Sequence, residues 1–247
     1  LDQIGSEVLS FLDMVDESFT ALGFANYRFE LSLRPEKRVG SDEMWDKAEA
    51  ALTEILDGTG KEYKTMAGEG AFYGPKIDIF VPDAIGRDWQ LGTVQLDFSL
   101  PERFDLEYAA EDGSRQRPVV IHRAMYGSLE RFLGVLIEHL AGAFPLWMAP
   151  VQAVVVPIAD RHNDYCHEVG AKLKAAGIRV EVNDSNDRMN SKIRHAQLQK
   201  VPYMLVAGDR EVESATVAVR TRTGENLDPM SADDVVEKFL KQIAEKS

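Results

Sequence analysis

The chain has 247 residues, of which 45% are hydrophobic and 28% charged, and this length suits about two domains. Its net charge of −13 argues against a surface that is basic overall and coats nucleic acid, although one basic face is compatible with that total. No apolar run approaches the roughly 20 residues of a membrane span and no secretory signal opens the chain, so we expect no membrane partner.

Cysteine usage points to a reducing compartment. The single cysteine, Cys166, excludes an internal disulfide framework and a cysteine-rich zinc cluster, so we expect a cytoplasmic protein. Cys166 lies in a polar, helical context, which favours an incidental thiol over a nucleophile. The first residue is Leu1, within a helical pattern, and we therefore expect a piece of a longer protein.

The first half of the chain alternates helical and strand patterns. Apolar residues at helical spacing predict a helix from Ile4 to Leu22, and alternating ones predict a strand over 27–33. Ser41 suits the N-cap of a helix that ends before Asp57-Gly58-Thr59-Gly60. Strand runs joined by Gly-rich turns between helices predict an antiparallel sheet with packed helices. The further strand patterns cover residues 63–66, 76–81, 89–99 and 119–122.

Polar groups interrupt these strand patterns. The period of two places Gln95 and Asp97 on one face of a strand and Gln90 on the opposite face. A buried polar group costs roughly 1–3 kcal/mol if it is unpaired, so the face of Gln95 borders either a ligand or a satisfied polar network. The loop from Gly68 to Asp78 matches neither a Walker A motif nor a dinucleotide fingerprint, which favours a tight turn over a phosphate-binding loop.

The stretch His122–Phe132 joins a strand to a helix that we expect to end around Phe144. Gly127 and Ser128 stand at the junction, where backbone can come close to a ligand. Arg131, one turn into the helix, can project into a cleft, where a guanidinium stacks on a purine or pairs with phosphate. The alternative is a solvated or ion-paired arginine on an amphipathic helix.

A second pattern follows the proline-punctuated joint Trp147-Met148-Ala149-Pro150, where we place the boundary between domains 1–148 and 149–247. The valine-rich run Val151–Ile158 is typical of a strand buried on both faces. Helix and strand patterns then alternate to the end of the chain, which predicts an α/β domain. They are a helix over 161–176, a strand over 179–182, a helix over 187–199, strands over 203–207 and 216–221, and a last helix from Ser231.

Basic side chains gather in the sequence of this second domain, with Asn186 and Glu211 among them. Arginine forks, amides and carboxylates together are the groups that read splayed RNA bases. The alternative is a charged, solvated helix face. The basic residues are Arg188, Lys192, Arg194, Lys200, Arg210, Arg220 and Arg222.

Several motifs carry a family resemblance. Gly127-Ser128-Leu129-Glu130-Arg131-Phe132 is similar to the third motif of class II aminoacyl-tRNA synthetases, with Ser128 where many members have glycine. In the order of the chain, the segments that resemble threonyl-tRNA synthetases are Arg34–Trp45, Gly68–Asp78, Gly92–Phe98 and Ile121-His122-Arg123-Ala124. Those that resemble the anticodon-binding domain of class IIa synthetases are Val201–Gly208 and Val217–Arg220.

The resemblance implies an α+β fold for residues 1–148, the class II antiparallel sheet with helices, followed by an α/β anticodon-binding domain. It implies activation of threonine by ATP with Mg²⁺, which gives threonyl-adenylate, and transfer of the threonyl group to tRNA(Thr). By resemblance, Tyr73 and Gln95 bind the amino acid, and Lys76, Gln95 and Arg131 are catalytic residues.

The resemblance also assigns cofactor and RNA contacts. Gln90, Ser128 and Arg131 would hold ATP, and His122 would be one of three ligands of a catalytic zinc ion. In the second domain, anticodon bases would be contacted by Asn186, Glu211 and Arg220, and phosphate by the other basic residues.

The family takes its other two zinc ligands, its motif 2 arginine and its motif 1 dimer interface from sequence upstream of this region. A catalytic zinc ion needs about three protein ligands, which His122 alone does not supply. We therefore expect this chain by itself to be inactive or partial, and the intact enzyme to be a homodimer.

Two alternatives remain at this point. A non-catalytic tRNA-binding or regulatory paralogue would share the scaffold, and the retained Gln95, His122 and Arg131 weigh against it. A prolyl or glycyl synthetase shares the second domain but not the segment Arg34–Trp45.

Overall fold

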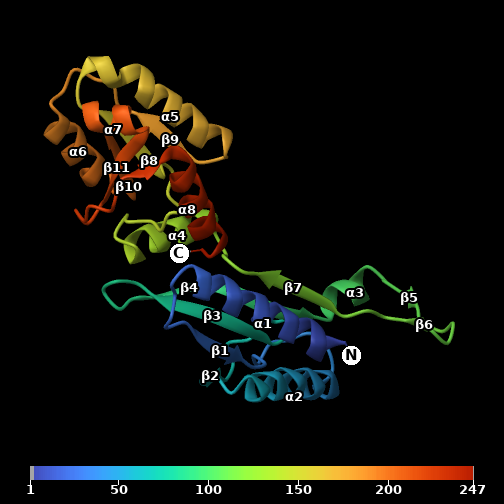
Figure 1. Cartoon of the computed structure of the whole chain (residues 1–247). Helices are drawn as coiled ribbons and strands as arrows, with labels where there is room; N and C mark the ends of the chain where they lie inside the picture. Colours follow the sequence, from blue (N-terminus) through green and yellow to red (C-terminus); the bar gives the residue numbers. More distant parts are fainter. Residues whose placement is uncertain (1–2, 247) are drawn as a thin grey trace. The chain divides into compact units, whose positions relative to one another are not determined.

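The computed structural model describes residues 3–246, which form two compact units (Figure 1). The first unit runs to His139, and the second begins at Leu140. Leu146 lies in the core of the second unit, and its carbonyl accepts a hydrogen bond from Gln152 Nε2 (2.8 Å). The structural division therefore falls earlier in the chain than the domain boundary expected at residue 148.

Within the described residues, the first unit contains a five-stranded sheet of order β2-β1-β3-β4-β7. Neighbouring strands are antiparallel except β1 and β2, which run parallel, so the predicted antiparallel sheet is confirmed apart from this edge pair. Strands β5 and β6 form a separate hairpin. The elements are α1 (Ile4–Ala21), β1 (Arg28–Ser32), α2 (Asp42–Thr59), β2 (Tyr63–Met66), β3 (Lys76–Pro82), β4 (Asp88–Asp97), α3 (Ser99–Arg103), β5 (Tyr108–Ala109), β6 (Arg115–Gln116), β7 (Val120–Ala124) and α4 (Leu129–His139).

Helix α2 begins where the sequence predicts. Ser41 has an extended backbone, and its Oγ accepts a hydrogen bond from the N–H of Met44 (3.3 Å), which also donates to the Ser41 carbonyl (3.1 Å). Asp42 and Glu43 in the first turn interact favourably with the positive end of the helix dipole. Gly60 ends the helix at φ +67°, a left-handed conformation that glycine adopts without strain.

One face of the first sheet is apolar. Phe29, Ile77 and Ile79 are at most 2% exposed, and Phe19 of α1 and Trp45 of α2 are completely buried with them. Burying a large apolar side chain contributes about 1.5–3 kcal/mol, so this layer is the main source of stability in the unit. Because successive side chains of a strand point to opposite faces, the other face of β3 and β4 is left for polar groups.

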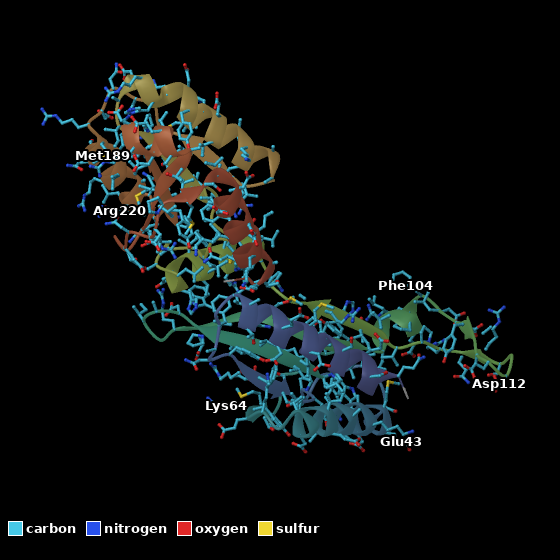
Figure 2. All side chains as sticks on the ribbon, viewed as in Figure 1. Glu43, Lys64, Phe104, Asp112, Met189 and Arg220 are labelled. Atoms are coloured by element: carbon cyan, nitrogen blue, oxygen red, sulfur yellow. The ribbon has the colours of Figure 1, made fainter. Side chains whose placement is uncertain are left out.

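Two parts of the first unit differ from the predictions. Helix α4 ends at His139, before the expected end near Phe144, because Ala141 and Gly142 both have positive φ (49° and 71°). Helix α3 and the β5–β6 hairpin lie between β4 and β7, where the sequence predicted only the end of a strand. Figure 2 shows Asp112 at the tip of this hairpin, which extends away from the sheet.

Within the described residues, the second unit has a five-stranded sheet of order β12-β11-β10-β8-β9. Strands β9, β8 and β10 are parallel, whereas β11 and β12 are antiparallel to their neighbours, so the predicted α/β alternation is confirmed. The elements are β8 (Ala153–Pro157), the 3₁₀ helix η1 (Asp160–His162), α5 (Asn163–Ala175), β9 (Val180–Val182), α6 (Met189–Leu198), β10 (Tyr203–Ala207), α7 (Asp209–Ser214), β11 (Thr216–Thr221), β12 (Met230–Ser231) and α8 (Ala232–Ala244). No helix within residues 3–246 is long and apolar enough to cross a membrane.

Side chains on the two faces of this second sheet build separate cores. Val155 and Leu205 pack with the buried sides of α5 and α8, whereas Val154 and Met204 pack with α6. The prediction that the valine-rich strand is buried on both faces is therefore confirmed. Cys166 lies in the first of these cores, and burial raises the pKa of its thiol to about 11, which keeps the thiol protonated at neutral pH.

Candidate functional site

The face of the first sheet that lies opposite the apolar core is polar. Lys76 of β3 pairs with Gln95 of β4, and Asp78 pairs with Thr93. Residues that face each other across an antiparallel pair point to the same side, so these four side chains share one face. The position of Asp78 among buried isoleucines is the sequence signal that could have identified it, as it did for Gln95.

A β-bulge brings a fifth polar side chain to this face. Gln90 pairs with Phe80, but the preceding residue of β3, Ile79, skips Leu91 when it pairs. The extra residue reverses the alternation, and Gln90 lies on the same face as Gln95. The prediction that the two glutamines lie on opposite faces is wrong, because a strict period of two includes no bulge.

Asp78 connects both strands on this face. Its Oδ1 accepts hydrogen bonds from Gln90 Nε2 (2.6 Å) and Thr93 Oγ1 (2.8 Å), and its Oδ2 pairs with Lys76 Nζ (2.6 Å). The Asp78 side chain is only 5% exposed, so its charge is compensated inside the protein. The polar face is therefore a satisfied network at Asp78, with outward-facing groups around it.

The loop before β3 presents Tyr73 to the same face. The Tyr73 hydroxyl donates to Gln95 Oε1 (2.6 Å), which leaves the Gln95 Nε2 group as the free donor. A Cβ at Gly74 would lie 1.7 Å from the carbonyl oxygen of Leu96, so only glycine allows the loop to approach β4 this closely. Because its backbone lies against β4, this loop fits the interpretation as a tight turn better than that as a phosphate-binding loop.

His122 lies beside these residues. It pairs with Gln95 across β4 and β7, and its ring centroid is 6.2 Å from that of Tyr73. The buried carboxylate of Asp97 accepts a hydrogen bond from His122 Nε2 (2.9 Å), since an ionised carboxylate can only accept. Nδ1 is therefore the nitrogen of the neutral ring that has a free lone pair.

This arrangement suits His122 as one metal ligand. Metal-binding histidines commonly donate their second ring N–H to a carboxylate, as His122 does to Asp97. Within residues 3–246, however, no group of three or more His, Cys, Asp or Glu side chains could hold a metal ion. The described residues thus fit one zinc ligand and do not complete a zinc site.

Arg131 of α4 reaches this region from the helix side. Its NH1 group donates to the carbonyl of Gln90 (3.2 Å), and its guanidinium carbon lies 5.7 Å from the centroid of the Trp89 ring. Ser128 Oγ accepts from the Arg131 N–H (3.3 Å) and donates to Glu130 (2.8 Å), so its hydroxyl stabilises the start of the helix. Trp89 is a contact that the sequence analysis missed.

The residues predicted to contact the anticodon lie apart from one another in the second unit. Glu211 caps α7 through a hydrogen bond from the Gly208 N–H (2.9 Å), at the carboxyl end of β10. Arg220 pairs with Met204 near the opposite end of that strand, roughly 10 Å away at 3.3 Å per residue. Asn186 is exposed in the loop between β9 and α6.

Two of the basic residues have partners within the second unit. Lys192 is 5% exposed, and its Nζ lies 3.4 Å from the Pro157 carbonyl. Arg222 donates to the Phe144 carbonyl (2.5 Å) and is half-buried. Burial argues against a contact between Lys192 and RNA phosphate, whereas a phosphate contact by the partly exposed Arg222 stays a prediction.

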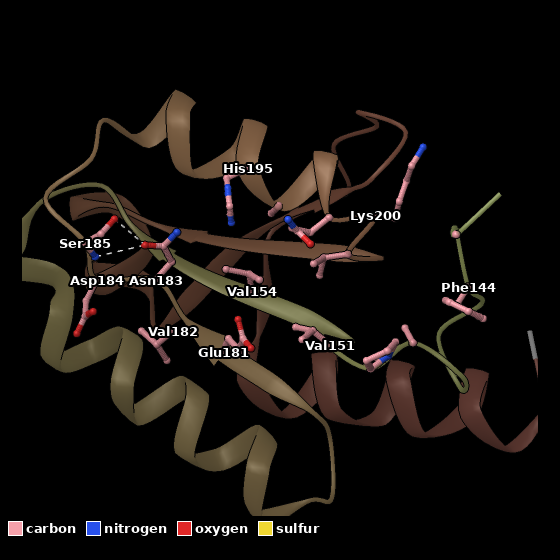
Figure 3. A pocket seen from close by; sticks show the side chains of 16 residues that line it. Phe144, Val151, Val154, Glu181, Val182, Asn183, Asp184, Ser185, His195 and Lys200 are labelled. Atoms are coloured by element: carbon pink, nitrogen blue, oxygen red, sulfur yellow. Dashed lines mark hydrogen bonds between the residues drawn. The ribbon is translucent and has the colours of Figure 1, made fainter. Parts of the chain in front are cut away.

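A groove of about 580 Å³ runs between α6 and the edge strand β9 (Figure 3). Its lining includes Val154, Glu181, Asp184 and His195, but none of the three residues predicted to contact the anticodon. The lining carries Glu181 and Asp184 of one charge sign and Lys200 of the other, so the charge of the groove does not mark it as a phosphate site.

Comparison with known families agrees with this description of both units. Residues 2–140 match the family described as tRNA synthetase class II core domain (G, H, P, S and T), and residues 152–242 match the anticodon binding domain. The chain belongs to the class II tRNA synthetase family.

Within that family the chain is similar to threonine–tRNA ligases. It is 51% identical over 246 residues to the threonine–tRNA ligase of Caldanaerobacter subterraneus subsp. tengcongensis. The matched region covers 100% of this chain but only 38% of the relative. The motif-based resemblance to threonyl-tRNA synthetases is therefore confirmed.

Solved structures agree. The RNA binding domain of threonyl-tRNA synthetase from Cryptosporidium parvum Iowa II superimposes with a TM-score of 0.91 at 40% identity, over 97% of this chain and 60% of that one. A putative threonyl-tRNA synthetase from Aeropyrum pernix gives a TM-score of 0.81 at 29% identity, over 99% of this chain and 60% of that one.

Proposed function

We propose that this chain is the part of a threonine–tRNA ligase that joins threonine to ATP and binds the anticodon of tRNA(Thr). The observation that supports it is the single polar face shared by Lys76, Gln90 and Gln95, with Arg131 bonded at its edge. The chain spans about 38% of the length of the threonine–tRNA ligases it matches, so the activity of the complete protein belongs to the proposal.

The first step is attack of the threonine carboxylate on the α-phosphate of ATP–Mg²⁺, with loss of pyrophosphate. No protein nucleophile takes part, so catalysis rests on positioning and on stabilising developing charge. Arg131 binds the nucleotide through its flat guanidinium face and its N–H donors, beside Gln90 and Ser128. Lys76, held by Asp78, contributes positive charge near the reacting oxygens.

Tyr73 and Gln95 bind the amino acid. Because the Tyr73 hydroxyl occupies Gln95 Oε1, the Gln95 amide offers its Nε2 donors to the threonine carboxylate. A bound zinc ion would supply a Lewis-acid contact to the amine and hydroxyl of threonine, which valine cannot reproduce. His122 would provide one ligand through Nδ1, and the remaining ligands would come from outside the described residues.

The second unit binds tRNA. Asn186, Glu211 and Arg220 read bases of an opened anticodon loop, because amides, carboxylates and arginine forks match the edges of unstacked bases. Exposed Arg188, Arg194 and others contact phosphate. The proposal includes that the complete enzyme is a homodimer and acts in the cytoplasm, where tRNA is charged.

The experiment that tests the proposal is amino-acid-dependent ATP–pyrophosphate exchange by the complete polypeptide that carries this chain. We expect exchange with threonine and little with valine, serine, proline or glycine. Exchange that depends on proline or glycine would identify a different synthetase. No exchange with any amino acid, together with intact tRNA binding, would favour the non-catalytic paralogue.

A further inference from the structure

We propose that Asp78 is a positioning residue that fixes the amide of Gln90 with its carbonyl oxygen outward, so that the nucleotide site selects a hydrogen-bond donor. This inference rests on the proposed function, because it assumes that Gln90 contacts ATP. It goes further by stating the kind of group that Gln90 recognises on the nucleotide, a hydrogen-bond donor.

The direction of the hydrogen bonds decides how the Gln90 amide is oriented. Its Nε2 group donates and its Oε1 atom accepts. Here Oδ1 of Asp78 lies 2.6 Å from the end of the Gln90 amide, and an ionised carboxylate can only accept. The Nε2 group of Gln90 must therefore point to Asp78, and Oε1 must point away from it.

The Asp78 carboxylate is buried and held in place by its hydrogen-bond donors. Asp78 is 4% exposed, and Lys76 Nζ and Thr93 Oγ1 donate to it as well, so its carboxylate is held from three sides. Lys76 Nζ forms an ion pair with Oδ2 of Asp78 at 2.6 Å. A buried carboxylate that accepts from Lys76, Gln90 and Thr93 allows only one orientation of the Gln90 amide.

The backbone at Gln90 is also held in place. The bulge at Leu91 turns the Gln90 side chain to the polar face, and the Gln90 carbonyl accepts from Arg131 NH1 (3.2 Å). A Cβ at Gly127 would lie 2.9 Å from the Leu91 carbonyl oxygen, so the start of α4 packs directly on the bulge. Gln90 is thus fixed at both its backbone and its side chain.

An outward carbonyl oxygen accepts only from a donor on the ligand. On ATP, the donors that lie near a guanidinium stacked on the purine are the exocyclic amine of adenine and the two ribose hydroxyls. All three would satisfy Gln90 Oε1, and analogues that lack one donor each tell them apart.

The test is threonine-dependent pyrophosphate exchange by the complete polypeptide with ATP, ITP, 2′-deoxy-ATP and 3′-deoxy-ATP. We expect the wild type to lose about tenfold in kcat/KM with the one analogue that lacks the recognised donor, the value of roughly one hydrogen bond. In Asp78→Asn the new amide can donate, the Gln90 amide can turn over, and this ratio should fall below about threefold.

Two further variants keep the test decisive. Thr93→Val removes another partner of Asp78 but leaves the Gln90 bond, so it should keep the wild-type ratio. Gln90→Leu removes the acceptor and should abolish the preference for ATP over that analogue. A folded Gln90→Leu protein that keeps the preference overturns the proposal even if Asp78→Asn does not fold.

The outcomes separate the two claims. Wild-type exchange with no preference among the four nucleotides overturns the inference, as does a folded Asp78→Asn or Gln90→Leu protein that keeps the ratio. Equal loss with all four nucleotides in Asp78→Asn would mean a purely structural role and also overturns it. Absence of wild-type exchange with any nucleotide would instead refute the proposed function, and the inference would fall with it.

Discussion

Arg131 is a side chain whose contacts in the protein are few. Among the described residues it contacts the Gln90 carbonyl at 3.2 Å, the Ser128 hydroxyl through its own backbone N–H, and the ring of Trp89. None of these is a carboxylate, so the charge of the guanidinium is uncompensated by an ion pair within the described residues. Such a group is suited to an anionic ligand.

Replacing Arg131 with alanine should therefore impair adenylation. We expect the barrier to rise by about 2–4 kcal/mol, the value of one charge-assisted contact to developing charge. Threonine-dependent pyrophosphate exchange measures it, with Arg115→Ala in the exposed β5–β6 hairpin as the matched loss of charge. A change below about tenfold in Arg131→Ala would contradict the role assigned to this residue.

Arg220 tests the RNA side of the account. Its Nε atom is buried and has no partner among the described residues, and it pairs with Met204 on the side of the sheet that packs with α6. If Arg220 reads a base, Arg220→Ala should reduce discrimination between tRNA(Thr) and an anticodon-swapped tRNA by about 1–3 kcal/mol.

Filter-binding titrations of both tRNAs would measure this discrimination. Exposed Arg194 on α6 serves as the control, because loss of a phosphate contact weakens binding to both tRNAs equally. An equal loss for both tRNAs in Arg220→Ala would make it a phosphate contact.

At the scale of elements, the loop from Gly68 to Pro75 depends on a close approach of backbones. In Gly74→Ala, the new Cβ would meet the Leu96 carbonyl at 1.7 Å, so the loop must move away from β4 and separate Tyr73 from Gln95. We expect a loss of at least about 1–3 kcal/mol in unfolding free energy, and weaker threonine binding.

Gly58→Ala is the matched control for this variant. Gly58 lies in α2, and nothing lies within 4 Å of an added Cβ, so alanine there should stabilise the helix slightly. Urea unfolding of both variants measures the effect. Equal stability of Gly74→Ala and wild type would show that the loop does not need this contact.

Helix α7 is tied to η1 by a carboxylate. Arg161 donates to both oxygens of Asp209 (2.8 and 2.6 Å), and His162 Nε2 donates to one of them (2.8 Å). These hydrogen bonds, those from Arg161 first and that from His162 second, hold the pKa of Asp209 well below its usual range. A depressed folded pKa stabilises the protein above the unfolded pKa of about 3.9, and this stability is lost as pH falls through the folded value.

The difference in stability between wild type and Asp209→Asn should therefore be largest at neutral pH and shrink as pH falls below about 4. Urea unfolding at a series of pH values measures it, with exposed Asp228→Asn as the control for loss of a charge. A difference that stays constant from pH 7 to pH 2 would show that Asp209 is not held by these partners.

Regular elements could be predicted from sequence because their causes are local. Ser41 starts α2, and strands β10 and β11 have the predicted bounds, since capping and apolar runs decide them. The bulge at Leu91 could not be predicted, because it depends on how β3 and β4 pair. Helix α7 was missed because its six residues bury no side chain that would give a periodic signal.

The candidate site follows the same division. The motifs named Tyr73, Gln95 and His122, and the structure brings these three together. Asp78 interrupts an apolar strand pattern, which could have identified it as a polar position, but its partners Lys76 and Gln90 are known only once β3 and β4 are paired. Asn186, Glu211 and Arg220 remain predictions, because the structure does not bring their side chains together and contains no RNA that would show what each contacts.

At the scale of the whole molecule, the two units have separate cores and separate chemistry. The first has a polar sheet face, and the second is an α/β domain with exposed arginine side chains such as Arg188 and Arg194. This division suits the proposed activation of an amino acid by one unit and binding of tRNA by the other. The central claim of the account is that the polar face over β3, β4 and β7 is where threonine and ATP react.

The measurement that tests this most directly is a crystal structure of the complete polypeptide with a non-hydrolysable threonyl-adenylate analogue. We expect the adenosine beside Gln90 and Arg131, and the threonyl group within hydrogen-bond distance of Gln95 Nε2. An analogue that binds elsewhere, with the side chains of Gln90 and Gln95 free, would contradict the account.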